Sequence, residues 1–526
     1  MNSIKVLDVT LRDGGCVNDF NFGQEYMDKI LHSLEQSGVE YIELGYIDEK
    51  KGSAQGRTQY CDEQVIPKYF LKKKVPGVQY FAIMDYGKFD VDKLHDRTDR
   101  DVDCIRVAFH KENWREALEA GRKIIDKGYQ FFIQPMVTMR YTDMELLELI
   151  QAVNEQLPDA SAFYIVDSFG EMRGNDVVRL MHLVDKNLIP SMMLGFHSHN
   201  NLQLSYSNAM SLLSFPTNRN LMLDASVMGM GKGAGNLNTE LLLEHLNLYY
   251  GKSYQIAPLL ELIDEVINVI HKEMYWGYSV EYYLSSVNHC TPSYASHFYN
   301  KHMLPIDRVA ELLSMIAPEK RNSFDKQYAE ELYLSYNEGK AFDDAPVIDW
   351  LKTEIAGKKV LLVAPGKSIL DADAEIKAML ADPETVSISL NNFDFDTDYI
   401  LITREEMFDE AKNRGRNIIV PSNVTKTGSE AVHVIDYGKW IIKGPKTYDS
   451  SGVIGLKLME ALGAGEIVLA GFDGFSININ DNYYNPTMRK PVTEEQAVRR
   501  NQFYKELIAS IGTHIPVTFL TPSLYQ

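Results

Sequence analysis

The chain has 526 residues, of which 45% are hydrophobic and 24% charged, enough for roughly two to four domains with cores of their own. It contains 53 Lys and Arg residues and 73 Asp and Glu residues, which gives a net charge of −20. Because the sequence also lacks a basic cluster, general nucleic-acid binding is not expected. We expect a cytoplasmic protein without a membrane partner, because charges interrupt the N-terminus and no uncharged apolar run reaches about 18 residues. The four cysteines form no CxxC pair and predict free thiols in a reducing compartment.

Eight short β-branched and apolar runs recur before residue 235, and most precede a stretch of helical periodicity. The runs span residues 5–13, 41–46, 78–85, 104–109, 130–138, 162–170, 193–200 and 221–231. Intervening segments such as 23–38 and 113–128 carry apolar residues at helical spacing and end on glycine. This α/β alternation favours a (β/α)8 TIM barrel, with an open doubly wound sheet as the alternative.

The rest of the chain divides into a helical stretch and a second α/β pattern. We predict a barrel at 1–250, a helical extension and linker at 251–346, and a smaller Rossmann-like α/β domain at 347–526. The strands expected in the last domain are 358–366, 386–392, 399–404, 417–423 and 466–475.

Polar residues stand where three of the barrel strands end, which is where a parallel barrel carries its chemistry. His197 and His199 are two apart on one strand, so their side chains face the same side. Closing the barrel brings the end of the first strand, with Asp13, and the segment after the last strand, with Asn236, next to them. Two imidazoles, a carboxylate and an amide oxygen predict a site for a divalent ion such as Mn²⁺, Mg²⁺, Co²⁺, Fe²⁺ or Zn²⁺.

Three segments carry a family resemblance: TLRDGG at 10–15, GFHSHNN at 195–201 and DASVMGMGKGAGNLNTE at 224–240. They resemble the signature segments of the DRE-TIM metallolyases, pyruvate-utilising barrels that include 4-hydroxy-2-oxovalerate aldolase and hydroxymethylglutaryl-CoA lyase. The resemblance covers the whole predicted barrel.

The resemblance implies roles for five residues: Asp13, His197 and His199 as metal ligands, Asn236 as a further ligand, and Arg12 as an electrophilic arginine. Mn²⁺ is the expected ion, with Mg²⁺, Co²⁺ or Zn²⁺ as alternatives. A 2-oxo acid such as pyruvate would bind such an ion through a carboxylate oxygen and its keto oxygen, to which Arg12 would donate. The charge that develops on forming an enolate then lies beside the cation and the guanidinium.

Two positions depart from relatives within that superfamily. The CoA lyases carry a catalytic cysteine nine residues before the asparagine, where this chain has Val227, so we set the CoA lyase activity aside. The aldolases, whose third segment is the most similar, carry a base histidine three residues after the metal-binding aspartate, where this chain has Cys16. The proton carrier stays open among His110, Glu43, His289, a metal-bound water and the Cys16 thiolate.

Further site residues come from the family resemblance and from the ends of the predicted strands. Tyr294 lies where the aldolases place a substrate-facing tyrosine, with a packed aromatic as the alternative, and we group it with Arg12 and Cys16 as catalytic. Asp167 and Ser168 end the sixth strand and are expected to orient a substrate or ligand, although Ser168 could instead cap a helix. Glu43 and His289 complete the predicted substrate contacts.

The last domain begins with a strand, a tight glycine turn and a helix start at 360–371, an arrangement that presents backbone N–H groups to an anion. It matches neither the G-x-G-x-x-G pattern nor a P-loop, and a purely structural turn is the alternative. Together with 389–395 and 450–476, it resembles the nucleotide-binding folds of bacterial sialyltransferase-like and related polysaccharide-cluster proteins. That resemblance nominates five residues for nucleotide or nucleotide-sugar contact: Gly366, Ser368, Asn391, Ser451 and Gly452. His433 is either catalytic or a packed strand histidine.

These features predict a divalent-metal-dependent aldolase that joins or cleaves pyruvate, or a related 2-oxo acid, and an aldehyde. The second domain suggests a nucleotide-sugar partner and a role in surface-polysaccharide or modified-sugar biosynthesis. The alternatives are a Claisen-type acyl-CoA/2-oxo acid synthase, a glycosyltransferase active in the C-terminal domain, and an inactive barrel used as a scaffold. A homodimer is expected because related barrels often pair their helical extensions.

Overall fold

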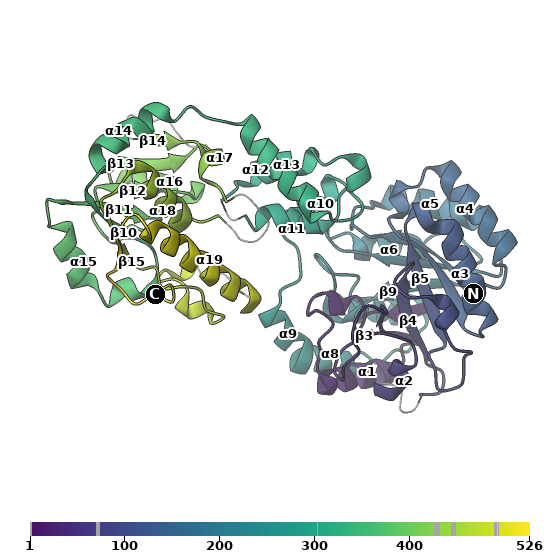
Figure 1. Ribbon diagram of the computed structural model, residues 1–526. Helices are drawn as coiled ribbons and strands as arrows, with labels where there is room; N and C mark the ends of the chain where they lie inside the picture. The colour runs from purple at the N-terminus through teal and green to yellow at the C-terminus, as the bar shows by residue number, and fades with distance from the viewer. Residues whose placement is uncertain are drawn as a thin grey trace. The chain divides into compact units, whose positions relative to one another are not determined.

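The structure is a computed structural model that describes residues 3–69, 74–301, 303–415, 417–424, 432–442, 449–488, 492 and 494–526. The chain separates into two compact units, Met1–Pro292 and Ser293–Gln526 (Figure 1). The predicted domain limits at residues 250 and 346 stay a prediction, since the unit boundary lies between them. Among the described residues, none of the helices combines the length and apolar character needed to cross a lipid bilayer.

The first unit contains a closed parallel barrel. Eight strands pair in the order β1-β2-β4-β5-β6-β7-β8-β9, and β9 pairs back with β1. Their bounds are β1 Ile4–Asp8, β2 Tyr41–Ile47, β4 Gln79–Asp85, β5 Cys104–Phe109, β6 Gln130–Pro135, β7 Ala162–Asp167, β8 Met193–Ser198 and β9 Leu221–Ala225. A two-residue strand, β3 (Gln59–Tyr60), adds to the edge of β2. The predicted TIM barrel is confirmed, with a strand in each of the eight predicted runs.

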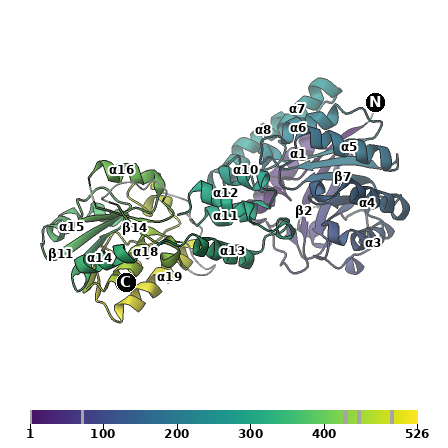
Figure 2. The same cartoon turned by 90° about the horizontal axis from the view of Figure 1, so that it is seen from above.

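Helices cover the outside of the barrel, where α3, α4 and α5 lie side by side (Figures 1 and 2). The first turn of α4 is closed by a capping box in which Thr142 and Glu145 bond each other's backbone N–H groups. The α-helices of this unit are α1 Gln24–Ser37, α2 Val65–Tyr69, α3 Trp114–Asp126, α4 Asp143–Gln156, α5 Gly174–Asn187, α6 Ser205–Leu213, α7 Thr239–Tyr250, α8 Ala257–Leu262, α9 Asn268–Glu273 and α10 Val280–Val287. A π-helical turn, Ile263–Ile267, joins α8 to α9.

Alternate residues on each strand face the helices or the barrel interior, because strand side chains alternate in direction. Leu7, Phe81 and Phe132 fill the interior in a cluster separate from the layer beneath the helices. Tyr164 also points inward, and a Cβ at Gly195 would lie 2.3 Å from its ring. The glycine therefore makes room for a large side chain whose hydroxyl reaches the polar end of the barrel.

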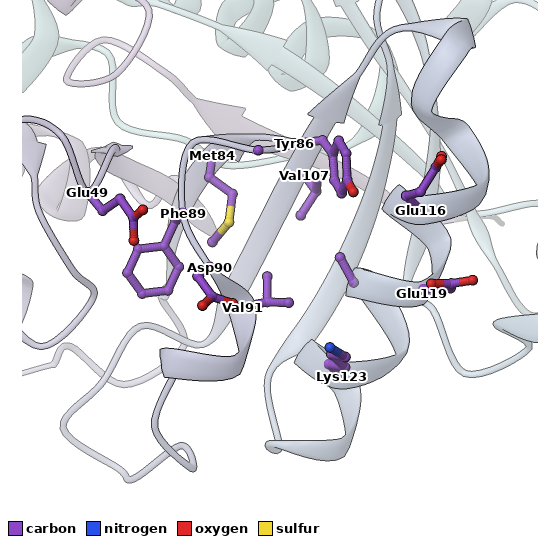
Figure 3. Close-up of a pocket in the computed structure, with 12 residues that line it drawn as sticks. Glu49, Met84, Tyr86, Phe89, Asp90, Val91, Val107, Glu116, Glu119 and Lys123 are labelled. Atoms are coloured by element: carbon purple, nitrogen blue, oxygen red, sulfur yellow. The ribbon is translucent and has the colours of Figure 1, made fainter.

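The connection from β4 to β5 contains only a short 3₁₀ turn, Val91–Lys93, in place of a crossover helix. A cavity of about 370 Å³ lies beside it, between this connection and α3 (Figure 3). Met84 and Val107 line it from the strands, and Glu116 and Glu119 line it from α3. None of the residues predicted for the metal site lines this cavity.

The second unit contains a parallel sheet of seven strands in the order β14-β13-β12-β11-β10-β15-β16. The strands are β10 Lys359–Val363, β11 Thr385–Leu390, β12 Tyr399–Leu401, β13 Asn417–Pro421, β14 Val432–Ile435, β15 Glu466–Ala470 and β16 Val517–Phe519. The prediction of a second α/β sheet is confirmed. The two edge strands, β14 and β16, are absent from the predicted set.

Helices cover both faces of this sheet. Ile376 of α15 packs against Leu361 and Val363, whereas α18 presents Gly455 to Leu362 and Leu390 on the other face. The helices are α11 Pro292–Tyr299, α12 Ile306–Ser314, α13 Lys326–Gly339, α14 Ala345–Ile355, α15 Asp373–Leu380, α16 Phe408–Asn413, α17 Tyr437–Trp440, α18 Ser451–Leu462 and α19 Glu494–Gly512. The strand order changes direction at β10, between β11 and β15, which is the point where open α/β sheets carry their ligands.

Candidate metal centre and active site

Asp13, His197 and His199 come together at the carboxyl end of the barrel. One ligand atom from each lies within 4.8 Å of the other two, and all three side chains are buried. Within the described ranges, this is the only such group of three or more His, Cys, Asp and Glu side chains. The structure thus assembles the carboxylate and the two imidazoles that the sequence pattern predicted.

Each of the two histidines has its Nδ1 fixed by an acceptor. His197 Nδ1 lies 3.0 Å from Asp224 Oδ2, and His199 Nδ1 lies 3.1 Å from the Lys232 carbonyl oxygen. An acceptor at Nδ1 favours the tautomer with the hydrogen on that nitrogen, and a ring in that tautomer keeps a lone pair on Nε2. A carboxylate or carbonyl behind the ring is the usual support of a metal-binding histidine.

Asn236 completes the cluster from the segment after β9. Its Nδ2 donates to Asp13 Oδ2 over 2.6 Å, and its Oδ1 is buried with no hydrogen-bond partner among the described residues. A Cβ at Gly231 would lie 2.7 Å from Asp13 Oδ2 and 2.3 Å from Asn236 Nδ2, so glycine keeps this side open. The orphaned amide oxygen, the Asp13 carboxylate and the two open Nε2 atoms are a donor set that suits a divalent cation.

Charge at the cluster suits a cation. Desolvation acts to raise the pKa of Asp13, but the Arg12 guanidinium and the two histidines outweigh it and hold that pKa well below its usual range. Burial lowers the pKa of His199 to about 4, against the opposing effect of Asp13. At neutral pH the carboxylate is therefore ionised and this imidazole is neutral, as metal ligands must be.

Arg12 is held at two of its three nitrogens. Its Nε donates to Glu43 Oε2 over 2.6 Å and its Nη1 donates to Asp13 Oδ1 over 2.9 Å. The third nitrogen, Nη2, is buried and bonds no described group. A buried guanidinium N–H without a partner is costly, so it indicates an acceptor that arrives with the substrate.

Beneath these groups lies a buried arginine that sequence analysis did not single out. Arg106 on β5 is fully buried, donates from Nη2 to Asp224 Oδ2 over 2.7 Å, and bonds Gln134 with its Nε and Nη2. Its Nη1 lies 3.5 Å from Glu43 Oε1, and its guanidinium stacks on the Tyr164 ring. Arg106 thus links the carboxylate behind His197 to the carboxylate that holds Arg12. The sequence could have revealed Arg106, because a charged residue at an inward position of a strand must be paired when it is buried.

Comparison with known proteins agrees with these motifs. Residues 89–262 match the family model described as HMGL-like. The 4-hydroxy-2-oxovalerate aldolase 2 of Comamonas testosteroni is 30% identical over 245 residues, which is 46% of this chain and 67% of that protein. The chain belongs to the DRE-TIM metallolyase superfamily. The 4-hydroxy-2-oxovalerate aldolase of Pseudoalteromonas translucida is 28% identical over 289 residues, 52% of this chain and 81% of that protein. A solved HMG-CoA lyase from Bacillus subtilis is 14% identical, with a TM-score of 0.42, over 52% of this chain and 95% of that one.

Cys16 stands where the family resemblance led us to expect a base histidine. Desolvation and the Asp13 carboxylate raise the pKa of its thiol to about 12. The protonated thiol is a poor base at neutral pH. Glu43, another of the predicted proton carriers, is fully buried between Arg12 and Arg106.

Two residues predicted to orient the substrate bond to the barrel's own loops. Asp167 accepts the N–H groups of Glu171 and Met172, at 2.9 and 3.1 Å, and its burial raises its pKa to about 8. Ser168 Oγ accepts the N–H of Val137 at 2.9 Å and caps no helix. Their substrate contacts stay a prediction.

The last two barrel candidates lie beyond α10. His289 belongs to the same unit as the metal cluster, and its Nδ1 lies 2.6 Å from Glu171 Oε2. Tyr294 falls in the second unit, where it is buried against Phe324 and accepts the N–H of Asp325 at 3.2 Å. The catalytic role of Tyr294 stays a prediction.

In the second unit, the glycine turn after β10 is held by an internal carboxylate. Asp473 accepts the Ser368 N–H at 2.8 Å and also bonds the Ser368 hydroxyl, while a Cβ at Gly366 would lie 2.2 Å from the Gly471 carbonyl oxygen. Close approach of two loops accounts for the glycine. The Ser368 N–H, which we predicted to be free to bind a phosphate, therefore donates to Asp473 instead.

The other nucleotide candidates lie around the same end of the sheet. Both amide atoms of Asn391 bond Thr403, at 2.9 Å each. Ser451 and Gly452 begin α18, where a Cβ at Gly452 would lie 2.6 Å from the Tyr504 hydroxyl. His433 stacks on Trp350 at 4.3 Å, as expected for a packed strand histidine. Nucleotide contact by these residues stays a prediction.

Replacing Asp224 with Asn tests the support behind His197. The amide removes the charge that holds the Nδ1 hydrogen, so we expect binding of Mn²⁺ to weaken by about 10- to 100-fold. Isothermal titration of the folded variant with Mn²⁺ measures this. Asp143→Asn, which alters an exposed ion pair with Arg179, is the control. Equal affinity in all three proteins would show that Asp224 does not support a metal ligand.

Proposed function

We propose that the barrel is a divalent-metal-dependent aldolase that makes or breaks a carbon–carbon bond between pyruvate, or a related 2-oxo acid, and an aldehyde. One observation carries the proposal: the unpartnered Nη2 of Arg12 lies beside a buried Asp13, His197 and His199 cluster. The similarity of the chain to 4-hydroxy-2-oxovalerate aldolases also supports it.

The residues of the chain can be assigned to steps of that reaction. Asp13, His197, His199 and Asn236 would hold the ion, for which we propose Mn²⁺ first. When bound, the ion would withdraw electron density from a keto oxygen and so stabilise an enolate. Arg12 Nη2 donates to that oxygen, while its other nitrogens stay fixed by Glu43 and Asp13. Because the guanidinium is held before the substrate arrives, its hydrogen bond strengthens as charge develops.

The second unit is assigned a separate role. We propose that it binds a nucleotide or nucleotide-sugar near the end of β10, in a pathway of surface-polysaccharide synthesis. The change of strand direction between β10 and β15 supports the location. Titration of the full chain with nucleoside mono- and diphosphates tests this. Absence of binding would leave the second unit without a nucleotide role and with no ground for glycosyl transfer.

The aldolase proposal is tested without knowledge of the aldehyde. We expect the methyl protons of pyruvate to exchange with deuterium from D₂O when enzyme and a catalytic amount of Mn²⁺ are present. Proton NMR measures the loss of the methyl signal after the ion has been chelated. Exchange should stop when EDTA is present from the start. No exchange by protein that binds Mn²⁺ in a parallel titration would contradict enolisation of pyruvate.

A further inference from the structure

An imidazole with a carboxylate partner lies at the active end of the barrel. The His289 side chain is 57% exposed, whereas its partner Glu171 is 3% exposed. The Nδ1 of His289 lies 2.6 Å from Glu171 Oε2, and no described group bonds its Nε2. A buried carboxylate that fixes one ring nitrogen and leaves the other open is the arrangement of a general base with its orienting residue.

Glu171 is itself fixed from two directions. Its N–H donates to Asp167 Oδ1 over 2.9 Å, and its carboxylate binds Arg140 through Nη1 at 2.9 Å and Nη2 at 3.1 Å. Arg140 Nη2 also donates to the His289 carbonyl oxygen over 3.0 Å. The charged groups that face His289 are therefore Glu171 and Arg140, with Asp167 behind them.

The backbone of His289 adopts a left-handed conformation with φ of +57°. Residues other than glycine seldom occupy this region, and it persists where surrounding contacts impose it. Here Arg140 holds the carbonyl and Glu171 holds the ring of the same residue. Both halves of His289 are thus held by one ion pair.

This pair lies next to the backbone of a metal ligand. Gly170, which precedes Glu171, packs so closely that a Cβ there would lie 2.7 Å from the His199 carbonyl oxygen and from the Asn201 nitrogen. Both Arg140 and Glu171 follow the carboxyl ends of strands, β6 and β7. His289 therefore occupies the end of the barrel that carries the metal cluster.

The other predicted proton carriers lack this arrangement. Glu43 is neutralised by two arginines, and the Cys16 thiol stays protonated. His110 follows β5 and interacts electrostatically with the Asp85 carboxylate, but no hydrogen bond joins the two side chains among the described residues. Among these predicted carriers, His289 is the one whose described contacts join one ring nitrogen to a buried carboxylate and leave the other ring nitrogen open.

We propose that His289 is the proton carrier of the barrel, oriented by Glu171, in place of the histidine that Cys16 replaces. The inference rests on the proposed aldolase activity. Nε2 takes the proton from the pyruvate methyl carbon as the C–H electron pair forms the C2=C3 bond and the carbonyl pair moves onto the keto oxygen. The enolate then attacks the aldehyde carbon, and the imidazolium returns its proton to the new alkoxide. Retro-aldol cleavage runs these transfers backward.

Replacing His289 with Asn tests this directly, because asparagine tolerates a positive φ but cannot accept the proton. We expect exchange of pyruvate methyl protons to fall about 100-fold or more, while Mn²⁺ affinity, measured by isothermal titration, stays equal to that of the native protein.

His95→Asn is a matched control. His95 is 58% exposed and its Nδ1 lies 3.0 Å from the buried Glu63, so the pair has the same chemistry. It lies at the opposite end of the barrel, since the nearby Arg97 N–H bonds Lys127 just before β6 begins. Exchange by this variant should equal that of the native protein.

Glu171→Gln separates a positioning role from packing. Loss of the carboxylate destabilises the imidazolium, so the acid limb of the exchange-rate profile should move to lower pH. An unchanged profile would mean that Glu171 does not act on the base.

The outcomes separate the two proposals. Native exchange together with undiminished exchange by His289→Asn would overturn the role of His289 and leave the aldolase proposal standing. Absence of exchange in the native protein, with Mn²⁺ bound, would overturn both.

Discussion

Replacing Asp13 with Asn is expected to abolish detectable Mn²⁺ binding and pyruvate exchange. The carboxylate is the only anionic member of the cluster of Asp13, His197, His199 and Asn236. It also accepts from Arg12 Nη1 at Oδ1 and from Asn236 Nδ2 at Oδ2. Since loss of a partner behind a ligand costs about 10- to 100-fold in affinity, loss of a charged ligand should cost on the order of 1,000-fold. Isothermal titration and the exchange experiment measure the two effects.

Asp19→Asn provides the comparison for this variant. Asp19 lies six residues further on, is 85% exposed, and pairs with Arg57 at 3.2 Å. Its φ is +52°, which asparagine accommodates. Removing its charge should leave Mn²⁺ affinity and exchange unchanged. If Asp13→Asn bound Mn²⁺ as tightly as Asp19→Asn, the cluster would not be the metal site.

The barrel and the cluster of Asp13, His197 and His199 could be predicted because both depend on position along strands. Strand and helix periods alternate in the sequence, and a parallel barrel brings strand ends to one face. His197 and His199 are two residues apart, so their shared direction follows from strand geometry alone. Asp13 joins them because β9 pairs with β1 and closes the barrel.

The supporting network could not be predicted, since it depends on which inward side chains meet across the barrel. Arg106 stands in a run that reads as an ordinary apolar strand, yet it contacts Gln134, Asp224 and Glu43 from three other strands. The same holds for Asp167, whose carboxylate turns toward the loop that follows it. Pattern and propensity give the direction of a side chain but not its partner.

The glycine turn at Gly366 shows a different limit. A strand, a glycine and a helix start predict free N–H groups, but the sequence does not show that the loop after β15 closes on this turn. Asp473 from that loop takes the Ser368 N–H. A ligand at this turn would therefore compete with a carboxylate already in place.

Replacing Arg12 with Lys is expected to lower the rate of pyruvate exchange by about 100- to 1,000-fold while Mn²⁺ still binds. The guanidinium bonds Glu43 and Asp13 in fixed directions and leaves Nη2 open for the proposed contact with the substrate. An ammonium group on a flexible stem cannot reproduce that fork. The metal ligands themselves are untouched, so binding and turnover should separate.

Arg115→Lys is the matched control, because Arg115 is 65% exposed and pairs with Glu148 on the barrel surface. Exchange by that variant should equal the native rate, since an exposed ion pair contributes little. If Arg12→Lys retained full exchange, the Nη2 group would not act on the keto oxygen. If it lost Mn²⁺ binding as well, Arg12 would act mainly by holding Asp13 in place. Retained Mn²⁺ binding with slow exchange would instead assign the buried, unpartnered nitrogen to the enolate.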